Sequence, residues 1–378
     1  MDLKDRNNSF TFLRLVFSIA VVISHSYAIG GFGNDPLMSV TGGEVTLGFI
    51  AVLSFFIVSG FLITGSAVRH TLPRFLINRA ARILPGFWTV QLITALVMAP
   101  LLILAKYPVV EGYFDSLIIG RNSALSYLGN NAFLHIRQYS ILDLFKELPA
   151  GASVNGSLWS LGPEATCYLY LGLFTIVGGL RARVLAPLLF LFVYTVHTLV
   201  CLEPKSAEIV SRVFSKGGIL LLHNNYYRSV YVAFVSGLLF YQYRHLLRWN
   251  WVGLTTSLLL LTGGCFCQRF ALVWPLTLPY IVLYLAFRLP FERLDRCGDF
   301  SFGIYIYSFP IQQCLALAGL HHLGVIPFAL ASVTLALGAG VLSWRLIEKP
   351  SLDWVRSVQV RRTSPVVPVT ASAPAEIV

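Results

Sequence analysis

The chain has 378 residues, a mean hydropathy of +0.72 and a charged fraction of only 12%. Soluble proteins carry about 25% charged residues, so this composition excludes an ordinary soluble globule and favours a membrane protein. The net charge is +11, but the basic residues recur at the ends of apolar segments instead of forming one run. That distribution is typical of membrane loops. We therefore expect a lipid bilayer around the chain and no nucleic-acid partner.

Ten apolar segments follow one another along the chain, each near the roughly 20 residues that a helix needs to cross a bilayer. They span residues 10–29, 45–66, 86–105, 158–179, 184–201, 228–243, 251–268, 270–288, 301–320 and 326–346. Each is too long and too uniformly apolar for a barrel strand. The sequence therefore predicts an all-α fold, a polytopic transmembrane bundle of about ten helices.

The positive charges predict how this bundle is oriented. With the N-terminus inside, the inner segments hold about twice as many Lys and Arg residues as the outer ones, as the positive-inside rule requires. We therefore expect both termini to be cytoplasmic and two long loops, 106–157 and 202–227, to lie outside. Residues 1–350 are predicted to form one membrane domain, and 351–378 a disordered cytoplasmic tail.

Two ionisable residues stand in the first apolar segment, where a charge is costly and points to function. Arg14 and His25 are eleven residues apart. At about 100° per residue they face the same side of a helix, and about 16 Å separates them along its axis. Alternatively, Arg14 extends to the inner headgroups and His25 bonds a neighbouring helix.

The fourth segment begins with Ser157-Leu158-Trp159 and carries Glu164 one to two turns later. Because this segment enters from outside, Glu164 is predicted at a depth similar to that of His25. A carboxylate beside a histidine suits general-base catalysis, since it orients the ring and supports its charge. The alternative is a purely structural ion pair. Gly162-Pro163 should kink or interrupt the helix here.

A third charged group precedes the segment at 86–105. Arg79 and Arg82 are three residues apart and share a helix face, and Arg74 lies just before them. Clustered arginines suit the capture of phosphates, which coenzyme A carries. The alternative is simple positive-inside charge.

At this point the chain resembles the acyltransferase-3 family of bacterial membrane-bound polysaccharide O-acyltransferases. The blocks that carry the resemblance are Phe12-Leu13-Arg14 with His25, Phe55 to Ile63, Arg74 to Pro85, Ser157-Leu158-Trp159 with Glu164, Ser301 to Tyr307, and Ile347-Glu348-Lys349-Pro350. They come in the family's order and cover nearly the whole chain. Leu53-Ser54 and Ser308 depart from it, since many members have an acidic residue before the Phe-Phe pair and a histidine at the latter position.

The resemblance implies an enzyme of the bacterial inner membrane that moves an acyl group, by default acetyl, from acyl-CoA to a glycan or lipid-linked oligosaccharide. It also implies that Arg14 and His25 match the family's essential Arg and His. Arg79 and Arg82 match the arginines after the second helix, and Glu164 matches the acidic position of its block. We expect acyl-CoA as a co-substrate, with no metal and no resident cofactor.

These residues predict a mechanism in which the arginines, Arg74 included, bind the phosphates of acyl-CoA. His25, with Glu164 as the candidate to orient it, takes the proton of the acceptor hydroxyl. Tyr305 or Ser59 is a further candidate, for polarising the thioester carbonyl. The alternatives are a covalent acyl relay, a scaffold, and a transporter or flippase, which intramembrane charges would serve equally well.

Overall fold

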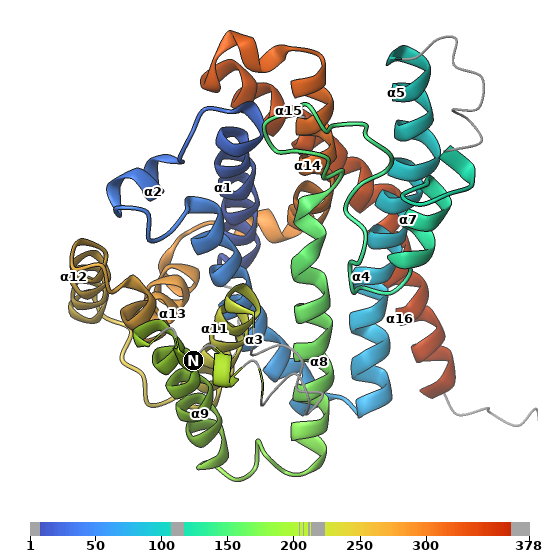
Figure 1. Ribbon diagram of the computed structural model, residues 1–378. Helices are drawn as coiled ribbons and strands as arrows, with labels where there is room; N and C mark the ends of the chain where they lie inside the picture. The colour runs from blue at the N-terminus through green and yellow to red at the C-terminus, as the bar shows by residue number, and fades with distance from the viewer. Residues whose placement is uncertain are drawn as a thin grey trace, which may run out of the picture.

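The computed structural model describes residues 8–106, 117–203 and 224–363, together with 205–206, 208–210 and 212. Every regular element within these ranges is a helix, and the helices pack side by side in one bundle (Figure 1). The all-α prediction is therefore confirmed for the described part of the chain. The outer loop predicted at 202–227 falls mostly outside it.

Each predicted span overlaps a helix. The longest elements are α1 (Phe10–Gly30), α3 (Leu47–Arg69), α4 (Leu72–Ile93), α8 (Leu161–Ile176), α9 (Leu185–Leu202), α11 (Asn225–Gln242), α12 (Trp251–Phe266), α13 (Phe270–Arg288), α14 (Ser301–Leu317), α15 (Val325–Ser343) and α16 (Lys349–Thr363). Within the described residues, six helices are long and apolar enough to cross a membrane. The ten-span count and the orientation of the termini stay predictions.

The third predicted span starts too late. The sequence placed its beginning at residue 86, because the arginines before it interrupt the apolar run. Instead, α4 begins at Leu72, with Pro73 in its first turn. Phe75 and Ala81 are buried, so this arginine-bearing half has an apolar face that packs against the bundle. The helix continues through a π-helical turn, η1 (Thr94–Met98), into α5 (Ala99–Lys106).

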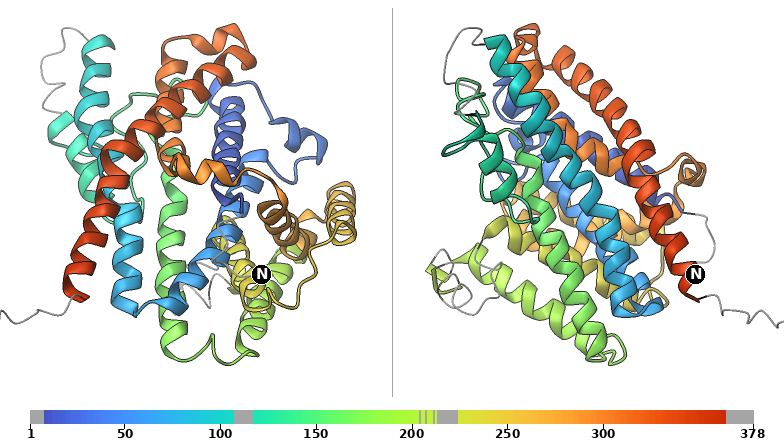
Figure 2. Two further views of the ribbon diagram at one scale, coloured as in Figure 1. Left: turned by 180° about the vertical axis from the view of Figure 1, so that it is seen from behind. Right: turned by 90° about the vertical axis from the view of Figure 1, so that its right-hand side faces the viewer.

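The last span is also longer than predicted. It runs from α15 through a second π-helical turn, η5 (Trp344–Glu348), into α16. The assignment of residues 351–363 to a disordered tail is therefore wrong, because α16 packs against α4, where the Gln359 amide donates to Asn78. Figure 2 shows α16 close to α4, whereas α5 and α15 diverge at the other end. Residues 364–378 lie outside the described residues, and the division into domains stays a prediction.

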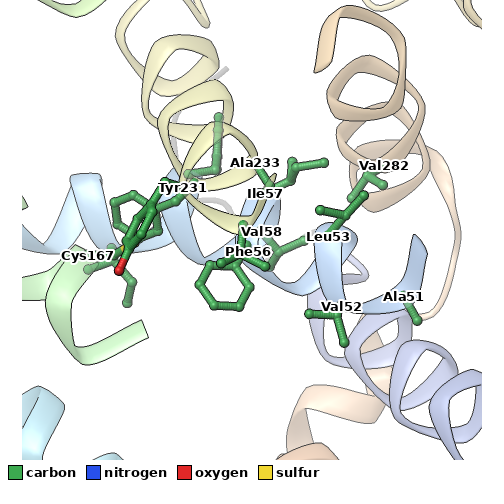
Figure 3. Packing of buried hydrophobic residues seen from close by; sticks show 14 of the residues in the cluster. Ala51, Val52, Leu53, Phe56, Ile57, Val58, Cys167, Tyr231, Ala233 and Val282 are labelled. Atoms are coloured by element: carbon green, nitrogen blue, oxygen red, sulfur yellow. The ribbon is translucent and has the colours of Figure 1, made fainter. Parts of the chain in front are cut away.

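The centre of the bundle is the contact between α3 and α11. A Cβ at Gly60 would lie 2.0 Å from the Phe234 carbonyl oxygen, and one at Gly237 would lie 2.1 Å from that of Ile57. Only glycine allows the two backbones to approach this closely. Leu53 and Ile57 fill the space beside this contact, as Figure 3 shows. A rigid centre of this kind fixes the helices that carry the polar residues.

The segment from 117 to 160 is folded against the ends of α4 and α14. It contains α7 (Ala124–Asn130) and a 3-10 turn, η2 (Gly156–Ser160), that leads directly into α8. The Asn131 side chain accepts from the backbone N–H groups of Arg137 and Gln138, and the Trp88 indole donates to the Ala132 carbonyl at 2.9 Å. These bonds hold the segment in place. Pro163 stands in the first turn of α8, where the 3-10 turn gives way to the α-helix.

Candidate active site

Two cavities lie inside the bundle. The first, which we call the arginine cavity, has a volume of about 460 Å³ and lies between α1, α3, α4, α8 and α14. Its polar lining consists of Arg14, Ser59, Ser66, Arg69, Arg79, Arg82, Ser160, Glu164, Tyr168, Asp299, Ser301, Tyr305 and Arg356. Five arginines and two carboxylates therefore line one space, which leaves an excess of positive charge for an anionic ligand.

An ion-pair network forms one wall of this cavity. Asp299 contacts Arg14 at 2.5 Å and Arg82 at 2.7 Å, and the other end of the Arg82 guanidinium contacts Glu348 at 2.6 Å. Asp299 precedes α14, and Ser301 donates a hydrogen bond to it. Burial would raise the pKa of Asp299, but Arg14 and Arg82 lower it to about 2. This carboxylate therefore stays charged and holds both arginines in place.

Arg79 and Arg82 have different surroundings, although α4 presents them one turn apart. The Arg82 guanidinium is paired with two carboxylates and lies over the rings of Phe302 and Trp344, 5.7 and 5.3 Å from their centres. The buried Nε of Arg79 has no hydrogen-bond partner among the described residues. Arg79 is thus the arginine with hydrogen-bonding capacity left for a ligand, whereas Arg82 is largely occupied within the protein.

Glu164 lies on the α8 side of the same cavity. Tyr168, one turn further along α8, donates its hydroxyl proton to Glu164, and the Ser59 hydroxyl lies 3.1 Å from the Tyr168 oxygen. The expected pairing of Glu164 with His25 is not formed. The reason is that α8 directs Glu164 toward the arginine cavity, while His25 lines a separate space.

The second space, which we call the histidine cavity, has a volume of about 420 Å³. It is lined by Val21, Ser24, His25, Thr46, Gly48, Phe49, Val52, Tyr139, Gly156, Trp159, Asn224, Tyr226, Tyr227 and Tyr305. The His25 ring stands edge-on to Phe309, and its buried Nδ1 has no hydrogen-bond partner within the described chain. Apart from His25, the described residues of this lining include no histidine, lysine, arginine, aspartate or glutamate.

The two cavities meet at Tyr305 and Val52, which line both. The Tyr305 hydroxyl is 2.7 Å from the Ser160 hydroxyl, at the end of the 3-10 turn η2. Arg14 lines the cavity on one side of this boundary, and His25 lines the cavity on the other side. Both cavities therefore lie along one face of α1, which agrees with the common face predicted for these two residues. A group held at the boundary would reach the lining of both cavities.

The structure brings most of the predicted residues together. Arg14, Ser59, Arg79, Arg82, Glu164 and Tyr305 all line the arginine cavity. His25 lines the adjacent one, and Arg74 lines neither, since its Nε donates to the Gln359 side chain on α16 at 3.0 Å. The chemical roles of these residues stay predictions.

The sequence did not single out Asp299, and it pointed to Glu348 only within the Ile347–Pro350 block. Glu348 has no exposed surface and accepts a hydrogen bond from Ser343 at 2.8 Å. Its place in the block was a usable signal, because a carboxylate between apolar residues near a helix end needs a partner. Asp299 gave no such signal, since it stands in a short polar connection.

Residues 7–345 match the protein family described as "Acyltransferase domain", and they include the lining of both cavities except Leu352 and Arg356. The chain belongs to the acyltransferase-3 family. It is therefore an acyltransferase, and its apolar helices agree with a membrane protein. The family assignment confirms the resemblance found in the sequence.

Two relatives of this acyltransferase have similar lengths. An "O-acetyl transferase" of Shigella phage Sf6 is 27% identical over 349 residues, covering 91% of this chain and 96% of the relative. "Nodulation protein 10" of Rhizobium leguminosarum bv. viciae is 26% identical over 368 residues, covering 94% and 96%. No solved structure matches the acyltransferase. The first relative supports membrane O-acetylation.

Proposed function

We propose that this acyltransferase moves an acetyl group from acetyl-CoA to a hydroxyl of a cell-surface glycan or lipid-linked oligosaccharide in the bacterial inner membrane. The observation that carries the proposal is the meeting of an arginine cavity and a histidine cavity at Tyr305. A donor in the first and an acceptor in the second would place thioester and hydroxyl at one boundary. Such positioning is a large part of catalysis in transfer reactions.

The arginine cavity is the proposed donor site. Coenzyme A carries phosphates, which need cations that are not already paired. Arg79 has an unpartnered Nε, and Arg69 lines the same cavity, as does Arg356, which forms an exposed ion pair with Asp353 at 3.5 Å. Arg14 and Arg82 are held by Asp299, so we assign them to shaping the cavity and its potential. Arg74 lies outside the cavity and would contribute only at long range.

The histidine cavity is the proposed acceptor site, with His25 as general base. In this mechanism the His25 imidazole takes the proton of the acceptor hydroxyl as the hydroxyl oxygen attacks the thioester carbonyl. The tetrahedral intermediate then collapses, the C–S bond breaks, and the thiolate of coenzyme A leaves and recovers the proton. Tyr305, whose hydroxyl lies at the boundary, is placed to donate to the carbonyl oxygen as charge develops there.

A direct transfer is favoured over a covalent acyl relay. The hydroxyl nearest in sequence to His25 that lines its cavity belongs to Ser24, and it donates to Asp35 at 2.6 Å. Asp35 also accepts from the backbone N–H groups of Met38 and Leu47, so Ser24 is part of a structural cap. A nucleophile needs a base as its partner, and this serine has a carboxylate that is already occupied.

The proposal is tested on the surface glycans of a bacterium that lacks this protein. The strain is complemented with wild type, His25→Ala or, as a control, His322→Ala, whose exposed ring lies outside both cavities. Mass spectrometry and proton NMR should show an acetyl signal with wild type and His322→Ala, and none with His25→Ala at equal protein level. Unchanged acylation in the deletion strain, with a lipid-linked intermediate accumulating, would favour a transporter and overturn the proposal.

A further inference from the structure

The wall of the histidine cavity combines aromatic rings with neutral polar groups. Tyr139, Trp159, Tyr226 and Tyr227 line it from three separate segments of the chain. The remaining polar side chains belong mainly to serine, threonine and asparagine, and among the residues that the structure describes no Lys, Arg, Asp or Glu contributes. This composition suits an uncharged ligand that presents both apolar faces and hydroxyl groups.

The rings form an ordered group. Trp159 stacks on Tyr227 with centroids 5.8 Å apart and planes at 15°, and Tyr226 lies at the same distance but tilted by 59°. Phe49 meets Tyr226 edge-on at 5.4 Å. Aromatic contacts of this kind fix the orientation of each ring. The indole is therefore held in position before any ligand binds.

Backbone hydrogen bonds anchor the segments that carry these rings. The Asn224 side chain caps α11 by accepting from the N–H groups of Tyr226 and Tyr227. The Asn155 amide donates to the Ile306 carbonyl at 2.8 Å, and its oxygen accepts from Ser157, which fixes the turn that carries Trp159. The wall is thus supported by two asparagine caps, which lowers the entropy cost of binding.

Tyrosine and tryptophan also gather at membrane interfaces, where they face lipid headgroups. The position of Trp159 differs from that arrangement. Its ring lines the same cavity as His25 and Thr46, and it contacts two tyrosines of the same chain, Tyr226 and Tyr227. The amide nitrogen of Asn224 has no hydrogen-bond partner among the described residues, so a donor remains in the same lining.

We infer that Trp159, with Tyr226 and Tyr227, is the platform for the acceptor sugar, and that the unit it holds is an uncharged pyranose. This inference rests on the proposed function and adds the chemistry of the acceptor. The C–H groups on one face of a pyranose carry partial positive charge and pack on the electron-rich face of an aromatic ring. The hydroxyl groups at the ring edge then meet Thr46, Asn224 and His25. A uronic acid or phosphorylated unit would find no lysine or arginine among the described residues of this lining.

The first experiment measures glycan binding without chemistry. The probe is the producing strain's surface glycan, freed of ester groups with mild alkali and titrated into detergent-solubilised full-length protein. Binding is followed by calorimetry. Trp159→Ala should weaken binding about tenfold, and Trp159→Phe should recover most of the loss because it keeps a ring. Trp251→Ala is the matched control, since that indole is exposed on α12, outside both cavities.

The second experiment measures transfer in membranes with acetyl-CoA and the same de-esterified glycan. Trp159→Ala should raise the acceptor KM about tenfold and leave the donor KM within about twofold. Unchanged glycan binding and unchanged acceptor KM in Trp159→Ala would overturn the platform while leaving the proposed function intact. A lower protein level with an unchanged acceptor KM would assign Trp159 to the membrane interface. Absence of transfer by wild type would contradict the proposed function, and the calorimetry would still decide the platform.

Discussion

The two cavities are similar in size, about 460 and 420 Å³, but their linings are opposite in chemistry. The arginine cavity gathers five guanidinium groups and two carboxylates. The histidine cavity has aromatic rings, hydroxyls and one imidazole. Tyr305 and Val52 line both cavities, so the lining changes from charged to uncharged across the width of a single side chain.

The difference shows how one helical bundle can separate two kinds of recognition. Charges within a membrane protein are costly unless they are paired, and here Asp299 and Glu348 pair Arg14 and Arg82. Among the described residues that line the two cavities, the unpaired arginine charge lies on one side of Tyr305. A neutral ligand on the other side then avoids the desolvation cost that charged groups impose. The following predictions test that separation, beginning with the largest effect.

Reversing one charge in the arginine cavity should impair donor binding. Arg79→Glu replaces an unpartnered cation with an anion, so we expect the KM for acetyl-CoA to rise about 100-fold while the acceptor KM changes little. Arg74→Glu is the matched control on the same helix, because Arg74 points away from the cavity toward Gln359. Initial rates in membranes give both constants. Equal effects of the two substitutions would contradict the assignment of the cavity to the donor.

Asp299 should couple the stability of the arginine cavity to pH. A folded-state pKa of about 2 against an ordinary value of 3.8 corresponds to about 2 kcal/mol of stability. Because the folded pKa is the lower one, this stability is present above pH 3.8 and is lost as the pH falls toward 2. Asp299→Asn should therefore lower the thermal unfolding midpoint at pH 7, and the difference from wild type should shrink below about pH 4.

The control for this measurement is Asp353→Asn, because Asp353 lies on α16 with half of its side chain exposed and forms weaker ion pairs. It should leave the midpoint near that of wild type. A difference between Asp299→Asn and wild type that stays constant from pH 7 to about pH 3 would show that Asp299 does not act through its charge.

Salt should distinguish the two cavities without any substitution. Raising the ionic strength from about 0.05 to about 0.5 M shortens the screening length severalfold. We expect the donor KM to rise about threefold because its site is cationic, and the acceptor KM to stay constant because its site is neutral. A parallel rise in both constants would show that the linings do not divide recognition by charge.

The sequence predicted the helical elements well because their signal is local. Each long apolar segment became a helix, and even the division at Gln268-Arg269 is real, with Gln268 in a left-handed conformation between α12 and α13. The extent of α4 was harder to predict. Arg74, Arg79 and Arg82 excluded this stretch from the apolar span, although Phe75 and Ala81 form a buried face between them. A helix that is half polar has too weak a hydropathy to be recognised as part of a span.

The candidate site was predictable only in part. Arg14, Glu164 and His25 were recognisable because ionisable groups are rare in apolar segments. Asp299 was not recognisable, because its role in the site depends on its ion pairs with Arg14 and Arg82, which lie 285 and 217 positions away in the chain. The separation of His25 from Glu164 also follows from tertiary packing. The sequence predicted that the two residues lie at similar depths in the membrane. Only the packing of α8 determines which cavity each of them lines.

The π-helical turn at Trp344–Glu348 determines which residue completes the ion-pair network. A π turn carries one more residue than the α-helix allows for the same turn, so it brings positions five apart onto one face, as the bond from Ser343 to Glu348 shows. Deleting one residue there would turn the α16 rod by about 100° and move Gln359 away from Arg74 and Asn78. The rotation of the helix at this turn therefore determines that Glu348 is the acidic residue facing Arg82. A comparison of relatives that checks only for a glutamate at this position would overlook the extra residue of the π-helical turn, which orients that glutamate.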